Sequence, residues 1–174
     1  MFLEGPRIYL REVRLSDVND NYYQWMNDPE VTNFMEIRFR PQSMEEIKNY
    51  VEMRTGSQDE PFFAIITKGE VHSHIGNVKL GPINWIHRNA DVSLFIGCKH
   101  LWHKGYATEV IRLITDYAFN TLNLFKLKAG VYSENLASYS AFKATGFEIE
   151  GRLKKQVICN GKRQDVILLG KINE

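Results

Sequence analysis

The stretch DVSLFIGCKHLWHKGYATEV, residues 91–110, determines the predicted fold of this chain. Its first part alternates the apolar Val92, Leu94 and Ile96 with side chains on the opposite face, which is typical of a β-strand. Its last part opens a segment, residues 104–122, in which apolar side chains recur at helical spacing. A strand that turns directly into an amphipathic helix favours a mixed α/β architecture.

Sequence patterns in the rest of the chain predict further strands and helices on either side of this strand and helix. Ser43 and Glu46 form a capping-box pair, Ser133 is the expected cap of the last helix, and Asn160-Gly161 is a hairpin turn. We expect a single domain, residues 1–174, with one sheet layer and helices on both faces. Strands are expected over residues 7–13, 61–67, 72–80, 126–132, 149–159 and 165–172, and helices over residues 18–26, 43–53 and 134–145.

Composition and charge narrow the class of protein. The chain has 174 residues, of which 44% are hydrophobic and 25% charged, and its formal net charge is +1. These values are those of a globular domain, and nothing in them indicates a surface that coats nucleic acid. The start of the chain lacks a basic segment followed by an apolar one, and no apolar run approaches the ~20 residues of a membrane span. We expect a cytoplasmic protein with no nucleic-acid or membrane partner.

Neither the cysteines nor the histidines form a disulfide or metal pattern. Cys98 and Cys159 have no framework spacing, which favours a reducing compartment. His72 and His74 lie on one face of a predicted strand, but no third carboxylate or thiolate ligand accompanies them. No metal site is predicted.

The turn before the long helix has the features of a phosphate site. The first backbone N–H groups of a helix have no intrahelical partner and lie at the positive end of its dipole. Gly105 lets a ligand approach the backbone, and Ala107 adds only a methyl group. A glycine is also common in ordinary turns, so both interpretations stay open on this feature alone.

Three further segments carry a resemblance to a known family. They are SENLASYSAFKATGFEIEGR at residues 133–152, YLREVRLSDV at residues 9–18 and WMNDPEV at residues 25–31. With the turn before the long helix, they make the chain resemble the GCN5-related N-acetyltransferase (GNAT) family, and in it the ribosomal-protein acetyltransferase-like branch. The resemblance implies a twisted, mostly antiparallel sheet of about seven strands with a splayed parallel pair, flanked by about four helices. It also implies an acetyl-CoA-dependent N-acetyltransferase, an acyltransferase that acts on a primary amine.

The resemblance implies where coenzyme A binds. In the family, a turn of the form Q/R-x-x-G-x-G/A holds the pyrophosphate through backbone amides. Gly105 and Ala107 match this turn, whereas Trp102 replaces the Gln or Arg and His103 stands where glycine is common. The strand before the turn should splay so that its backbone pairs with the pantetheine arm. The implied coenzyme-binding residues are Phe95, Ile96, Gly97, His103, Lys104, Gly105, Tyr106, Ala107, Thr108 and Asn135.

Acetyl transfer releases coenzyme A as a thiolate, which a nearby acid can protonate. The candidates for this acid follow Asn135 in the sequence. Many GNAT enzymes use a tyrosine in the pattern N-x-x-A-x-x-x-Y, but Phe142 occupies that position here. The resemblance makes Ser138, which matches a serine proposed as donor in the ribosomal-protein branch, the first candidate and Tyr139 the second. Both hydroxyls can instead bond to helix carbonyls, and Asn135 can satisfy its own backbone at the start of the helix.

The base that deprotonates the amine has several candidates. Asp91 opens the strand that should lead to the acetyl group, where relatives in the polyamine branch carry a glutamate. It can equally cap a turn. His87 and Glu150 are further candidates, and a water chain without a dedicated base is another.

The amine acceptor should bind near an aromatic and arginine-rich stretch, residues 22–41. Its side chains can stack on a ring or bind a diphosphate, or they can simply pack on the sheet. The predicted acceptor-binding residues are Trp25, Asn27, Arg38 and Arg40.

Three classes of amine acceptor are considered, together with one function that is not enzymatic. An amino-sugar nucleotide is favoured because Arg38 and Arg40 suit anions. A protein N-terminal amine and a polyamine are the alternatives, the latter with an acidic pocket. A non-catalytic acyl-CoA-binding module is the rival, and family members often form homodimers. The carboxylates available for an acidic pocket are Glu30, Glu36, Glu45 and Glu46.

Overall fold

The computed structural model describes residues 1–174 and contains one sheet of eight strands in the order β1-β2-β3-β4-β5-β6-β8-β7. All neighbouring strands are antiparallel except β5 and β6, which are parallel. The mixed α/β fold with a parallel pair is therefore confirmed, with a short additional strand at the start of the chain. The strands are β1 (Leu3–Glu4), β2 (Ile8–Glu12), β3 (Phe62–Thr67), β4 (His74–Asn84), β5 (Asn89–Ile96), β6 (Lys126–Tyr132), β7 (Glu148–Cys159) and β8 (Lys162–Ile172).

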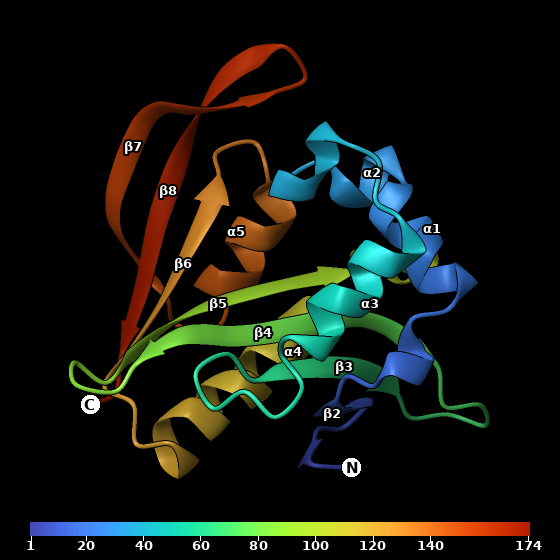
Figure 1. The fold of residues 1–174 in the computed structure, drawn as a ribbon. Helices are drawn as coiled ribbons and strands as arrows, with labels where there is room; N and C mark the ends of the chain where they lie inside the picture. Colours follow the sequence, from blue (N-terminus) through green and yellow to red (C-terminus); the bar gives the residue numbers. More distant parts are fainter.

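Helices cover both faces of the sheet, as Figure 1 shows. Helices α1, α2 and α3 lie on one face, and α4 lies on the other. None of the helices has the length and apolar character needed to cross a membrane. The helices are α1 (Asp20–Asn27), α2 (Pro29–Thr32), α3 (Met44–Glu52), α4 (Tyr106–Asp116) and α5 (Leu136–Lys143), with short helical turns η1 (Leu15–Asp17), η2 (Glu36–Phe39), η3 (Lys99–Leu101) and η4 (Tyr117–Thr121).

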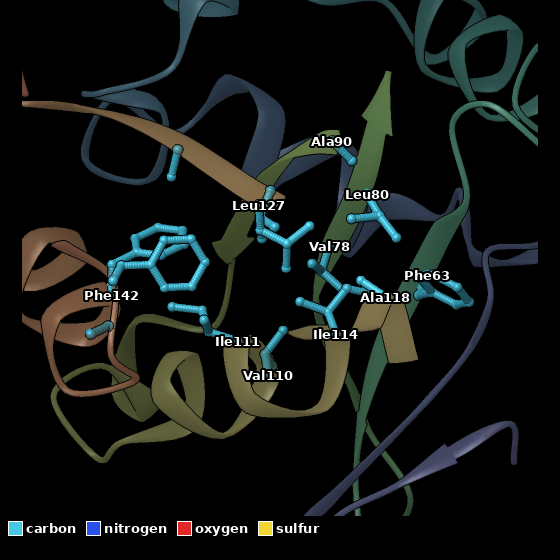
Figure 2. Close-up of a cluster of buried hydrophobic side chains, with 14 of the residues drawn as sticks. Phe63, Val78, Leu80, Ala90, Val110, Ile111, Ile114, Ala118, Leu127 and Phe142 are labelled. Atoms are coloured by element: carbon cyan, nitrogen blue, oxygen red, sulfur yellow. The ribbon is translucent and has the colours of Figure 1, made fainter. Parts of the chain in front are cut away.

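The larger core cluster lies between the sheet and helices α4 and α5. In Figure 2, Val110, Ile111 and Ile114 of α4 point toward Val78 of β4 and Leu127 of β6. Their spacing along α4 is the helical period seen in the sequence. The packing explains why this stripe is apolar while the opposite side of the helix is not.

The smaller core cluster lies on the opposite face of the sheet, under α1 and α3. Trp25 of α1 and Val51 of α3 pack there against Ala64 and Ile66 of β3. The ring of Trp25 lies directly against Gly97, at a distance that leaves no space for a Cβ atom. Because this central part of the sheet is covered on both faces, strand β3 is almost entirely buried.

Capping decides where the helices begin. Ser43 and Glu46 form the predicted capping box of α3, in which each side chain accepts the backbone N–H of the other residue. The prediction that Ser133 caps the last helix is wrong, because Asn135 accepts the N–H of Ser138 and α5 begins after it. Similarly, Asn19 caps α1, so this helix begins two residues later than predicted.

The parallel strands β5 and β6 form a fork. Only residues 89–91 of β5 pair with residues 126–128 of β6, although both strands continue well beyond. Figure 1 shows the two strands starting side by side and then pointing away from each other. Ser93 and Gly130 lie just beyond the paired segment and are exposed despite their position in the middle of the sheet. The fork therefore leaves two strand edges open inside the molecule.

Candidate active site

The open edge of β5 offers backbone hydrogen-bonding groups to the fork. The Gly97 N–H donates to the Ile75 carbonyl at 2.8 Å. Because hydrogen-bonded and non-bonded pairs alternate along antiparallel strands, Leu94 and Ile96 direct their backbone groups away from β4 and toward the fork. The fork is thus built to receive an extended chain with its own amide groups.

Two of the backbone groups that were expected to pair with the pantetheine arm, in Ile96 and Gly97, already make hydrogen bonds within the protein. The Ile96 carbonyl accepts the Trp102 indole N–H at 2.7 Å, and the Gly97 N–H bonds to β4. Phe95 pairs with Asn77 of β4. Leu94, which the sequence reasoning did not single out, faces the fork instead. The alternation that identifies it was visible in the sequence, but the register with β4 was not.

The loop that enters α4 presents a row of unbonded amides. None of the backbone N–H groups of residues 103–108 donates a hydrogen bond within the protein. His103 and Gly105 both have left-handed backbone conformations, with φ of 58° and 80°. Amides at a helix N-terminus with such conformations form a concave anion site. This arrangement fits the pyrophosphate expected at His103, Lys104, Gly105, Tyr106, Ala107 and Thr108.

The start of α5 brings Asn135 and Ser138 together. The Asn135 side chain accepts the Ser138 N–H at 3.2 Å, so it caps the helix, which was the structural alternative considered for it. The half-buried Ser138 hydroxyl makes no hydrogen bond within the protein. Tyr139 packs against the larger core cluster. Phe142 is 2% exposed and meets Phe147 edge-on, with ring centroids 4.9 Å apart.

Asp91 lies at the base of the fork. It is the last residue of β5 that pairs with β6, opposite Lys128, and the Lys128 Nζ is 3.6 Å from its carboxylate. Both side chains remain nearly half exposed. The alternation of β5 places Asp91 on the same face as Ser93 and Phe95, which is the face covered by α1 and α3.

The residues predicted to bind the acceptor mostly serve the protein itself. The Asn27 amide bridges α1 to the following loop, donating to the carbonyls of Tyr23 and Gln42 at 3.0 Å. Trp25 is buried in the smaller core cluster. Arg40 is exposed and pairs with Glu46 at 2.7 Å. These contacts match the alternative that the stretch packs within the protein.

Arg38 is the predicted acceptor residue that reaches the fork. Its guanidinium donates to the Met35 carbonyl at 2.6 Å, the Tyr132 hydroxyl at 3.1 Å and the Ile158 carbonyl at 2.5 Å. It therefore ties η2 to the end of β6 and to the β7–β8 hairpin. Only 12% of its side chain is exposed, so little of its charge is available to an anionic ligand.

Glu36 and Tyr132 complete this polar group at the open end of the fork. The Tyr132 hydroxyl donates to the Glu36 carboxylate. Burial, followed by this hydrogen bond, raises the pKa of Tyr132 above its ordinary value. The Glu36 side chain is 73% exposed, so its carboxylate keeps a free face toward solvent. Sequence reasoning named Glu36 only as one of several carboxylates and missed Tyr132, which is the last residue of β6.

The histidines do not assemble a metal centre. His74 is partly buried beside Trp25 and bonds to the Asn77 side chain at 2.7 Å, and desolvation lowers its pKa. His72 lies against Tyr9 instead. No group of three His, Cys, Asp or Glu side chains converges anywhere in the chain.

The chain matches known acetyltransferases along its length. The acetyltransferase (GNAT) domain model matches residues 7–148. An uncharacterized N-acetyltransferase, p20 of Bacillus licheniformis, is 32% identical over 169 residues, which cover 95% of this chain and 93% of that protein. The spermidine N(1)-acetyltransferase of Escherichia coli (strain K12) is 32% identical over 122 residues, or 70% of this chain and 63% of that protein.

A solved structure gives the same match in three dimensions. The crystal structure of spermidine N-acetyltransferase from Vibrio cholerae in complex with CoA and spermine has a TM-score of 0.84 and 26% identity, covering 95% of each chain. These matches support the expected family. They do not support the ribosomal-protein branch within it, since the relatives are polyamine and Bacillus acetyltransferases.

Proposed function

The chain belongs to the GNAT acetyltransferase family, so it is an N-acetyltransferase with acetyl-CoA as co-substrate, and we propose that its acceptor is a linear polyamine such as spermidine. The similarity to spermidine acetyltransferases supports this choice. The observation that carries it is the Glu36 carboxylate, which faces solvent at the open end of the fork.

A polyamine suits this carboxylate because aliphatic amines are protonated at neutral pH. The acceptor then offers one amine to the acetyl group and further ammonium groups for recognition. Glu36 lies 3.8 Å from the Arg38 guanidinium, just as Glu30 pairs with Lys99 and Glu46 with Arg40. Glu36 differs from these two because it also bonds to Tyr132, the last residue of the strand that lines the fork. An anionic amino-sugar nucleotide is less favoured, because only 12% of the Arg38 side chain is exposed and Arg40 already pairs with Glu46.

Residues on the two sides of the fork then carry different parts of the reaction. The amides of residues 103–108 and the backbone of Leu94 bind the coenzyme, which places the thioester between β5 and β6. Asp91, directly or through water, takes one proton from the ammonium group, and the neutral amine nitrogen attacks the thioester carbon. As the C–S bond breaks, Ser138 gives a proton to the thiolate and receives the second proton of the attacking nitrogen.

A thiol-release assay with acetyl-CoA tests the acceptor. Spermidine, spermine and putrescine form one set, and UDP- or dTDP-amino sugars and N-terminal Ala or Ser peptides form the others. We expect release with spermidine or spermine and none with the other sets. Release with an amino sugar or a peptide alone would replace the polyamine proposal with that class.

The Glu36→Gln variant tests the carboxylate. We expect the KM for spermidine to rise about tenfold or more, since a hydrogen bond to a charged group contributes roughly 1.5–3 kcal/mol, and the KM for acetyl-CoA to stay unchanged. Glu45→Gln is the matched control, because Glu45 is exposed in the first turn of α3 and has no ion pair. If both variants raise the spermidine KM equally, the effect is one of overall charge and Glu36 has no specific role.

A further inference from the structure

An arginine from the start of the chain reaches the loop that enters α4. The Nη1 of Arg7 donates to the Lys104 carbonyl at 2.8 Å, across 97 residues of sequence. Its guanidinium lies 4.5 Å from the centre of the Tyr106 ring. Its Nη2 lies beside Gly105, 3.4 Å from the place where a Cβ would stand. Arg7 therefore contacts Lys104 and Tyr106 and lies beside Gly105, all within residues 103–108, the proposed coenzyme loop.

A buried carboxylate in the first turn of α4 holds Arg7 in place. Glu109 is 9% exposed and pairs with the Arg7 Nε at 2.8 Å. The other oxygen of Glu109 accepts the backbone N–H groups of Arg7 and Ile8, at 2.8 and 3.2 Å. One carboxylate thus fixes both the backbone and the side chain of Arg7 against the helix. Such charge-assisted bonds are stronger than neutral ones.

The coenzyme loop needs an external contact of this kind. His103 has a left-handed conformation, which costs a residue other than glycine about 1–3 kcal/mol. The free amides of residues 103–108 gain no hydrogen bond within the protein that would offset this cost. Lys104 is the one residue of this loop whose backbone bonds to a side chain from another element. Without Arg7, the loop would be free to relax into conformations that turn its amides elsewhere.

We propose that Arg7 is a positioning residue for coenzyme A. It holds residues 103–108 in the conformation that turns their amides to the phosphates, and its ion pair with Glu109 balances the negative charge of that carboxylate at this end of α4. The proposal rests on the coenzyme half of the proposed function and is independent of the amine acceptor.

Calorimetric titration tests the proposal without any acceptor. Arg7→Gln should weaken the binding of coenzyme A about tenfold and leave the binding of pantetheine, which lacks the phosphates, unchanged. Arg7→Lys, which keeps the charge but loses the forked donor, should fall between Arg7→Gln and the unaltered protein. With the amine identified by the thiol-release assay, the KM for acetyl-CoA should rise while kcat is retained.

Controls separate positioning from damage to the fold. Arg14→Gln removes the same charge from an exposed arginine that pairs with Glu12, and it should bind coenzyme A normally. Thermal melting identifies a variant that fails to fold, in which case Arg7→Lys carries the test. Equal weakening of coenzyme A and pantetheine, or unchanged coenzyme A binding in both Arg7 variants, would overturn the proposal. If Arg7→Gln weakens coenzyme A alone and spermidine is not acetylated, only the acceptor proposal fails.

Discussion

Replacing Phe142 with alanine is expected to lower the free energy of unfolding by about 3–5 kcal/mol. Phe142 is 2% exposed, packs on Phe147 and belongs to the cluster between α5, α4 and the sheet (Figure 2). The truncation removes most of a buried ring and leaves a cavity that rigid neighbours cannot fill. Urea unfolding followed by circular dichroism measures the change.

The control for this stability prediction lies on the same helix. Leu136 is 68% exposed at the start of α5, so Leu136→Ala should cost less than about 1 kcal/mol. A comparable loss in both variants would mean that α5 is sensitive to any substitution, and a loss below about 1 kcal/mol for Phe142→Ala would contradict the core role of the ring.

Replacing Ser138 with alanine is expected to lower kcat about a hundredfold, with little change in the KM for acetyl-CoA. The Ser138 hydroxyl is half-buried at the start of α5 and makes no hydrogen bond within the protein, so it is free to donate a proton. Its backbone N–H, which Asn135 caps, is retained in the variant. Steady-state kinetics with a polyamine acceptor measure the effect.

Neighbouring hydroxyls serve as controls for the proton donor. Ser140→Ala changes an exposed serine on the same helix and should leave kcat unchanged. Tyr139→Phe tests the second candidate, and Asp91→Asn tests the base. An unaltered kcat in both Ser138→Ala and Tyr139→Phe would mean that the thiolate leaves without a protein donor. That outcome is chemically reasonable because the thiol pKa is near 8.5.

The local parts of the fold were predictable because short stretches of sequence control them. The alternation of Val92, Leu94 and Ile96 gave β5 its strand conformation, and the helical spacing of apolar residues gave α4 its buried side. The Ser43 capping box and the Asn160-Gly161 turn were likewise visible in the sequence. The unbonded amides of residues 103–108 belong to this group, since they follow from a glycine turn into a helix.

The contacts that individual side chains make near the candidate site were not visible in the sequence. Arg38, Arg40 and Asn27 were expected to bind the acceptor, but each is bonded to other parts of the protein. The same amino-acid types serve recognition and internal pairing, and spacing alone does not distinguish the two uses. The partners of Arg38 illustrate the difficulty, because Ile158 lies 120 residues away in the chain.

The sequence by itself determined most of the strands, helices and turns, although not strand β1 or helix α2, and, through a resemblance, the family. The tertiary structure alone decided that Arg7 bonds to the coenzyme loop, that Tyr132 and Glu36 meet at the open end of the fork, and that Leu94 faces into it. Helix and strand signals depend on neighbours within a few residues. Contacts between distant segments depend instead on strand order and register, which arise only when the whole sheet assembles.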